Sequence, residues 1–171
     1  ADKATVAGVE VEVRKNLFVR PLSSAANGMN KLSFGLNGSY IYTNAKMPLA
    51  TVTTGSQLEG AAPWIANFDL SHNFTKGTHS FINTLVFNYV SDKIYTIGTQ
   101  GYQDIMEQGM MTLDFVSQAK LNKYVSLTLK ARNLLNPSYK LSRKANENGE
   151  KVILNDYKKG INISLGVSCT F

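Results

Sequence analysis

Residues 161–171, INISLGVSCTF, decide the fold class of this chain. Apolar side chains occupy every second position of this stretch, and polar residues or glycine fill the positions between them. Successive side chains of a β-strand point to opposite faces, so a period of two predicts a strand with one apolar and one polar face. A helix would instead repeat its apolar residues every three or four positions.

The same alternation recurs in six segments before this one. They are residues 5–15, 32–43, 64–74, 79–91, 111–121 and 124–133. In the third of them, Trp64, Phe68 and Leu70 alternate with Asn67 and Asp69. No helical period of comparable length is present. The sequence therefore predicts an all-β, antiparallel protein of about seven strands.

The links between the segments alternate in length. The short ones are 75–78 and 122–123, and the long ones are 44–63, 92–109 and 134–159. Transmembrane β-barrels show this alternation, with short periplasmic turns and long external loops. The link at 16–31 departs from it, because it falls on the short-turn side and spans about sixteen residues, where barrel turns on that side are short.

The last long link contains a turn motif of its own. Asn148-Gly149 is a pair typical of two-residue β-hairpin turns. It separates residues 139–143 from residues 151–157, so we expect a hairpin that extends the barrel wall above the membrane.

The placement of aromatic side chains favours a membrane barrel over a soluble β-sandwich, which alternation alone would fit equally well. With strands running alternately and residue 171 at the periplasmic end, rings gather at both ends of the strands. The external group is Tyr40, Tyr42, Trp64 and Tyr89, and the periplasmic group is Phe74, Phe81, Tyr124 and Phe171. Two aromatic belts around an aliphatic band are typical of a bilayer-spanning barrel.

The opposite face of the strands is polar and charged. Its ionisable residues include Glu10, Glu12, Arg14, Asp69, Asp114, Lys130 and Arg132. In a wide barrel, such a face lines a wet lumen or contacts a plug. Seven strands would leave two open edges, which lipid does not tolerate. We therefore expect further wall from chain preceding residue 1, or an eighth strand hidden in 16–31 or 44–63, which would make a complete small barrel with a structural or adhesive role.

Composition argues against several other functions. The net charge is +6, but Lys and Arg are spread along the 171 residues, which argues against nucleic-acid binding. No apolar run approaches the roughly 20 residues of a spanning helix. Cys169 is the single cysteine, and His72 and His79 lack metal-ligand spacing. No nucleophile–base or paired-carboxylate arrangement has suitable spacing, so we expect no enzymatic activity, cofactor or metal.

Three stretches resemble the end of a TonB-dependent outer-membrane receptor, particularly of the Bacteroidetes type. They are residues 58–74 (LEGAAPWIANFDLSHNF), 127–139 (LTLKARNLLNPSY) and 157–171 (YKKGINISLGVSCTF). The resemblance implies that residues 1–171 are the carboxy-terminal portion of a 22-stranded barrel with a plugged lumen. It also implies a bacterial outer-membrane location and the uptake of a scarce nutrient, such as an iron chelate, cobalamin or an oligosaccharide.

The same resemblance implies partners. They are outer-membrane lipid, the barrel-assembly machinery, the plug and barrel strands upstream of this chain, and a surface lipoprotein. Ser164, Gly166, Cys169 and Phe171 resemble the terminal signal that the assembly machinery reads, although Cys169 departs from the usual apolar or aromatic choice.

Tyrosines in the expected external loops are candidate ligand-binding residues. Tyr95, Tyr102 and Tyr139 could stack on a sugar or a chelate. Packing within the loops at the membrane rim is the alternative role for these rings. A soluble β-domain that binds a ligand is the remaining alternative for the whole chain.

The intact mass of the protein in its native membranes separates these possibilities. We expect a mass above roughly 60 kDa, from scaling the strand count to 22, against 18.8 kDa for these residues. Mass spectrometry of the protein extracted from those membranes measures it. A mass near 18.8 kDa would contradict the receptor interpretation and favour a small closed barrel.

Overall fold

The computed structural model describes residues 3–22, 28–46, 57–99, 101–145 and 150–170. Strands dominate these residues, and no helix among them is long and apolar enough to cross a membrane. The strands are β1 (Lys3–Pro21), β2 (Met29–Lys46), β3 (Trp64–Lys76), β4 (His79–Val90), β5 (Lys93–Thr96), β6 (Ile105–Glu107), β7 (Met110–Lys120), β8 (Val125–Arg132), β9 (Ser138–Lys144), β10 (Lys151–Lys158) and β11 (Asn162–Cys169).

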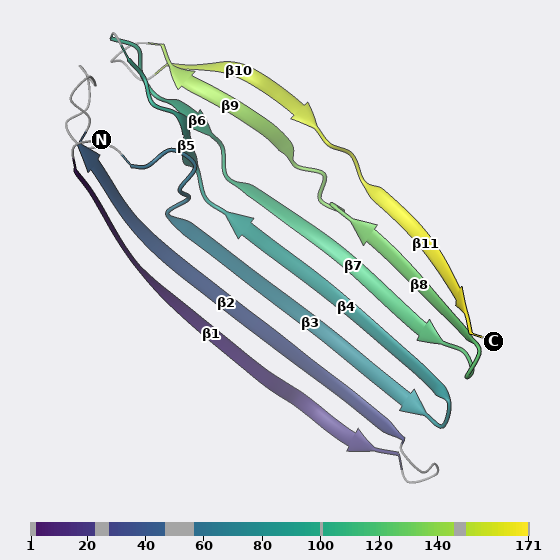
Figure 1. Cartoon of the computed structure of the whole chain (residues 1–171). Coiled ribbons are helices and arrows are strands. Elements are labelled where there is room, and N and C mark those ends of the chain that lie inside the picture. Colours follow the sequence, from purple (N-terminus) through teal and green to yellow (C-terminus); the bar gives the residue numbers. More distant parts are fainter. Residues whose placement is uncertain (1–2, 23–27, 47–56, 100, 146–149, 171) are drawn as a thin grey trace.

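The main sheet contains seven strands in the order β1-β2-β3-β4-β7-β8-β11, and every neighbouring pair is antiparallel. These strands are the seven segments that alternation predicts, so the all-β antiparallel fold is confirmed. Figure 1 shows them side by side, with the long links at one end and the tight turns at the other. We call these the loop end and the tight-turn end. Among the described strands the sheet is open, since β1 and β11 each pair on one side only.

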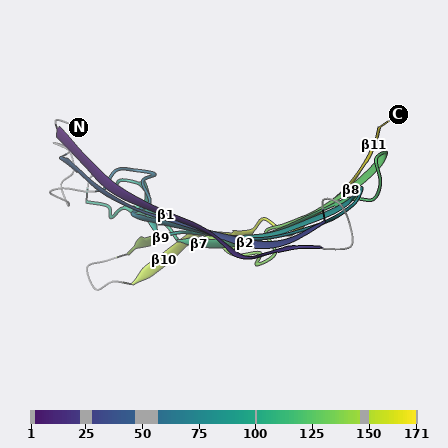
Figure 2. The ribbon, with the colours of Figure 1, turned by 90° about the horizontal axis from the view of Figure 1, so that it is seen from below.

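A smaller sheet of four strands, in the order β10-β9-β6-β5, lies at the loop end. Strands β9 and β10 are the hairpin that Asn148-Gly149 predicts, although the turn itself lies outside the described residues. Strands β5 and β6 correct the expectation of a plain loop over 92–109, because they pair with each other and β6 pairs with β9. Figure 2 shows β9 and β10 bending out of the curved main sheet.

Strand β1 is longer than alternation predicts. A register shift lies between Asn16, which pairs with Ser33, and Phe18, which pairs with Leu32. One extra residue in a strand reverses the parity of every residue that follows. Because the parity changes, the period of two does not reveal that β1 continues beyond Lys15. The structure corrects the long link expected at 16–31: β1 ends at Pro21 and β2 begins at Met29, so the link is residues 22–28. The amide of Leu22 donates to the carbonyl of Gly28 at 2.9 Å.

An eighth strand of the main sheet, expected within 16–31 or 44–63 if the barrel were small and complete, is absent from the described residues of both links. Residues 17–21 and 29–31 belong to β1 and β2, and residues 57–63 form no strand. Residues 47–56 lie outside the described residues.

Strand register sorts the side chains of the main sheet onto two faces. Val13, Leu36, Phe68, Phe87 and Leu113 are successive partners across five strands and form one row of the apolar face. In the described residues no second layer of protein covers this face, and side chains on both outer strands remain exposed, such as Val11 at 61% and Leu165 at 71%. A soluble sandwich would bury that face against a second sheet, and the described residues contain no such layer over it.

Aromatic rings mark both ends of the apolar face. Tyr40 and Trp64 have ring centroids 4.5 Å apart toward the loop end, and Phe74 and Phe81 have centroids 6.4 Å apart at the tight-turn end. Ten residues separate the two levels along β3. At a rise of about 3.3 Å per residue and a tilt near 40°, they span roughly 25 Å, the height of the apolar band of a membrane barrel.

The turn between β3 and β4 tests the importance of local backbone geometry. Gly77 has a φ of 61°, a left-handed conformation that costs a residue with a Cβ roughly 1 kcal/mol. We expect Gly77→Ala to lower the midpoint of guanidinium unfolding of the full-length protein in detergent. The matched control is Gly38→Ala, because a Cβ at Gly38 meets no atom within 4 Å and its φ is not positive. An equal shift in both variants would contradict this account of the turn.

Candidate functional site

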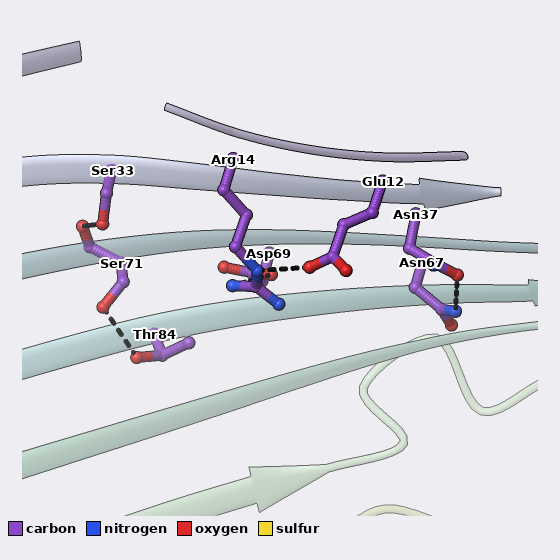
Figure 3. A network of polar contacts seen from close by, with 8 residues as sticks. All are labelled: Glu12, Arg14, Ser33, Asn37, Asn67, Asp69, Ser71 and Thr84. Atoms are coloured by element: carbon purple, nitrogen blue, oxygen red, sulfur yellow. Dashed lines mark hydrogen bonds and ion pairs between the residues drawn. The ribbon is translucent and has the colours of Figure 1, made fainter. Parts of the chain in front are cut away.

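The polar face of the main sheet carries a charged network near its first edge. Arg14 Nε lies 2.5 Å from Glu12 Oε1, and Arg14 Nη1 lies 3.6 Å from Asp69 Oδ1 on β3 (Figure 3). Arg14 reaches across β2 because the residue between Arg14 and Asp69 in register is Gly35, where a Cβ would overlap the Asp69 carboxylate. The missing side chain on β2 thus permits a charge pair between β1 and β3.

Asparagine, serine and threonine side chains make additional links between strands on the same face. Asn67 donates to Asn37 at 3.3 Å, and Asn37 donates to Glu10 at 2.6 Å, so one chain of hydrogen bonds crosses β1 to β3. Ser71 and Thr84 hydroxyls lie 3.2 Å apart, which links β3 to β4. These contacts leave the face hydrophilic along its length, as a surface that meets water or a polar partner requires.

A cavity of about 370 Å³ opens on the polar face where the two sheets meet. Its volume lies within the range of small-molecule sites. The lining residues are Met110, Thr112, Asp114, Arg132, Asn133, Pro137, Tyr139, Lys159, Gly160 and Asn162. They come from β7, β8, β9, β11 and the two links at the loop end of β8 and β11, so no local stretch of sequence encodes the cavity.

Two asparagines hold the walls of this cavity together. Asn133 and Asn136 have φ values of 59° and 44°, in the left-handed region that Asn tolerates better than most residues. The Asn133 amide donates to Asp114 Oδ1 at 2.8 Å, and its side-chain Nδ2 donates to the Gly160 carbonyl at 2.7 Å. Asn136 Oδ1 accepts from the Gly160 amide at 3.0 Å. The link after β8 is thereby tied to both β7 and the start of β11.

Tyr139 forms the aromatic wall of the cavity. Its ring centroid lies 5.1 Å from that of Tyr157, and Lys159 Nζ lies 5.6 Å from the centroid of Tyr139. Burial raises the pKa of the Tyr139 phenol above its ordinary value, and the nearby negative charge of Glu107 raises it further. The phenol is therefore neutral near pH 7 and can donate a hydrogen bond while its ring offers a stacking surface.

The three candidate tyrosines occupy different positions. Tyr139 lines the cavity, whereas Tyr95 is exposed on β5 and is not among the lining residues. Tyr102 instead lies in a separate hollow of about 170 Å³, where the Arg143 guanidinium sits 5.1 Å from its ring centroid. Of the three candidate tyrosines, only Tyr139 lines this cavity, and Tyr102 lines a different one.

Three of the four candidate assembly residues, Ser164, Gly166 and Cys169, lie on the edge strand β11. Ser164 and Gly166 share the polar face, and Cys169 is an exposed free thiol on the apolar face beside β8. Phe171 lies outside the described residues.

Sequence reasoning missed most of the cavity. Alternation places Asp114 and Arg132 on the polar face without indicating a site, and it gives Asn133 and Lys159 no role. The motif Asn133-Leu134-Leu135-Asn136-Pro137 is a turn signal that could have located the link between β8 and β9. Its contacts with β7 and β11 required the tertiary structure. No cluster of His, Cys, Asp or Glu in the described ranges could hold a metal ion.

Comparison with known proteins now identifies the sheet. Residues 1–134 match the family described as TonB dependent receptor-like, beta-barrel. The chain belongs to the TonB-dependent receptor family. These receptors reside in the bacterial outer membrane and are transporters or receptors, not enzymes. No curated protein and no solved structure matches the chain.

Membership of this family indicates what each face of the sheet contacts. The apolar face of a TonB-dependent receptor barrel meets lipid, and the polar face meets the lumen. The uncovered apolar side chains are thus satisfied by the bilayer, and the charged network and the cavity belong to the inside of the wall.

Titration of Tyr139 tests the environment of the cavity. Because the pKa is raised above 10.0 in the folded state, the neutral phenol contributes stability that is present below pH 10 and lost as pH rises through the raised pKa. We expect the ultraviolet difference spectrum between the full-length receptor and its Tyr139→Phe variant to show ionisation above pH 10. Ionisation below pH 10 in that difference spectrum would contradict burial of the phenol.

Proposed function

We propose that this chain forms the carboxy-terminal part of the barrel wall of a receptor that imports a scarce nutrient across the outer membrane. The candidate cargoes are an iron chelate, cobalamin or an oligosaccharide. The observation that carries the proposal is the cavity on the lumen face, which combines an aromatic wall with cationic and hydrogen-bonding groups.

The charges of the cavity favour cargo with anionic or oxygen-rich groups. Arg132 and Lys159 both line it, whereas its one carboxylate, Asp114, already accepts a hydrogen bond from the Asn133 amide. Guanidinium groups bind carboxylates and other oxygen acceptors in bidentate fashion. Tyr139 adds a flat surface on which a sugar or a chelate ring can stack.

The proposal includes the surroundings of the chain. Residues 1–171 would lie in the outer membrane of a bacterium, of the Bacteroidetes type, as one portion of a larger barrel domain whose lumen holds the plug. The barrel-assembly machinery would read Ser164, Gly166, Cys169 and Phe171 at the end of β11. A surface lipoprotein would cover the loop end.

Two substitutions in the full-length receptor test this function. We expect Arg132→Gln and Tyr139→Ala each to weaken binding of one cargo class by roughly tenfold, because each removes a charge-assisted hydrogen bond or a stacking surface. Binding is measured by calorimetry with three probes, a ferric siderophore, cyanocobalamin and an oligosaccharide. Lys123→Gln at the tight-turn end is the matched control, since it removes one charge far along the sheet from the cavity.

Two results would contradict this proposal. If one of the three probes binds the receptor and the cavity variants bind it as tightly as the wild type, the cavity does not contact cargo. If none of the three probes binds a folded receptor, the proposed cargo classes are wrong.

A further inference from the structure

A continuous track of polar side chains crosses the apolar, lipid-facing side of the sheet. It comprises Arg20 on β1, Asn30 on β2, His72 on β3, Asn83 on β4 and Ser117 on β7. Arg20 is the register partner of Asn30, His72 is that of Asn83, and Asn83 is that of Ser117. The step from β2 to β3 is a hydrogen bond of 2.8 Å between Asn30 Oδ1 and His72 Nε2.

The track lies at the tight-turn end of the lipid-facing side. Asn30 is the register partner of Phe74, which belongs to the aromatic pair that marks this end of the apolar band. His72 and Asn83 lie one row further into the band. Polar groups at this depth are costly in hydrocarbon unless they are paired or reach the headgroup region.

Internal hydrogen bonds satisfy only part of the track. Ser117 Oγ donates to Asn83 Oδ1 at 2.7 Å, so the two polar side chains on β4 and β7 are joined to each other. On β2, Asn30 uses its carbonyl on His72. Within the described contacts, this leaves the amide NH₂ groups of Asn30 and Asn83 and the guanidinium of Arg20 as donors, and of these Asn30 and Arg20 lie nearest the headgroup region. Arg20 is exposed and extends over the Phe18 ring, 5.8 Å from its centroid.

Charge on the two faces is sorted differently. The polar face carries both signs, as in the Glu12–Arg14–Asp69 network. The lipid-facing positions of the seven main-sheet strands contain no Asp or Glu. From the middle of the sheet to the tight-turn end, the basic side chains on this side are Lys15, Arg20, His72, Lys76 and His79. A surface of donors and bases without any carboxylate attracts phosphate.

We propose that Arg20, Asn30 and His72 form a binding site for the phosphate of an anionic phospholipid in the leaflet at the tight-turn end of the barrel. Arg20 supplies the charge, and the Asn30 amide supplies a neutral donor beside it. His72 fixes the Asn30 carbonyl so that the amide points outward. Phe18 and Phe74 flank the site and contact the acyl chains below the headgroup. Because the short turns of such barrels are periplasmic, this is the inner leaflet.

Lipid retention by the full-length receptor tests the site. The receptor is reconstituted with phosphatidylglycerol, and lipid that remains bound in detergent is counted by native mass spectrometry. We expect Arg20→Gln to lower the retained lipid about tenfold, as the loss of a charge-assisted hydrogen bond implies, and His72→Leu to lower it less. The matched control is Lys3→Gln, which removes one charge at the loop end of the same strand, and it should retain lipid like the wild type.

Three further measurements complete the test. Diacylglycerol with the same acyl chains should not be retained, because it lacks the phosphate. Excess inorganic phosphate should not displace the bound lipid. Heat-modifiable migration on gels should show that each variant is folded, and Arg20→Lys should keep part of the retention if Arg20→Gln misfolds.

Several results would overturn the proposal. Equal losses in Arg20→Gln and Lys3→Gln would show a general charge effect and not a site. Equal retention of diacylglycerol would assign binding to the acyl chains, and displacement by inorganic phosphate would assign the site to a soluble anion. If Arg20→Gln lost receptor dimers in native mass spectra but kept its lipid, a second copy of the chain, and not a phospholipid, would cover the track.

Discussion

The register between neighbouring strands is the constraint on which the rest of this structure depends. Each of the seven main strands offers an apolar and a polar side, and a slip of one residue would exchange them. The ladders keep the sides aligned from β1 to β11, so that rows such as Val13, Leu36, Phe68, Phe87 and Leu113 stay on one face. The one shift in the ladders of the main sheet, between Asn16 and Phe18, is absorbed in an edge strand, where it changes the side chains that β1 presents without disturbing its neighbours.

Two unlike environments follow from that sorting. The apolar face has no protein layer over it in the described residues and is stabilised by lipid, whereas the polar face holds charge pairs and hydrogen bonds across strands. Among the described residues, the few buried apolar side chains lie at the loop end: Ala45 near the end of β2, Ile94 in β5, and Ala62 and Ile97 in the links. Most of the chain therefore has no core of its own, and its stability depends on the bilayer and on neighbouring strands.

A few residues depart from the separation of apolar and polar side chains onto two faces. These departures are informative because polar groups in hydrocarbon and missing side chains carry a free-energy cost. Gly35 leaves space on β2 through which Arg14 pairs with Asp69. On the other face, His72 and Asn83 place polar groups within the apolar band, where their register and hydrogen bonds make them a continuous surface. Neither feature is visible in one strand alone, since each depends on side chains from two or three strands meeting at one level of the barrel wall.

The sequence by itself determined the seven main strands, their direction, their two faces and the β9–β10 hairpin, because alternation and turn chemistry are local properties of the chain. It also located Tyr139, though not the cavity around it. Only the tertiary structure decided the extension of β1 beyond Lys15, since the extra residue there breaks the period of two on which the prediction relies. Strands β5 and β6 were likewise hidden, because four and three residues are too few to show a period and their pairing depends on β9. The cavity required the same information, since Asp114, Arg132, Asn133 and Lys159 are brought together by hydrogen bonds between links that lie far apart along the chain.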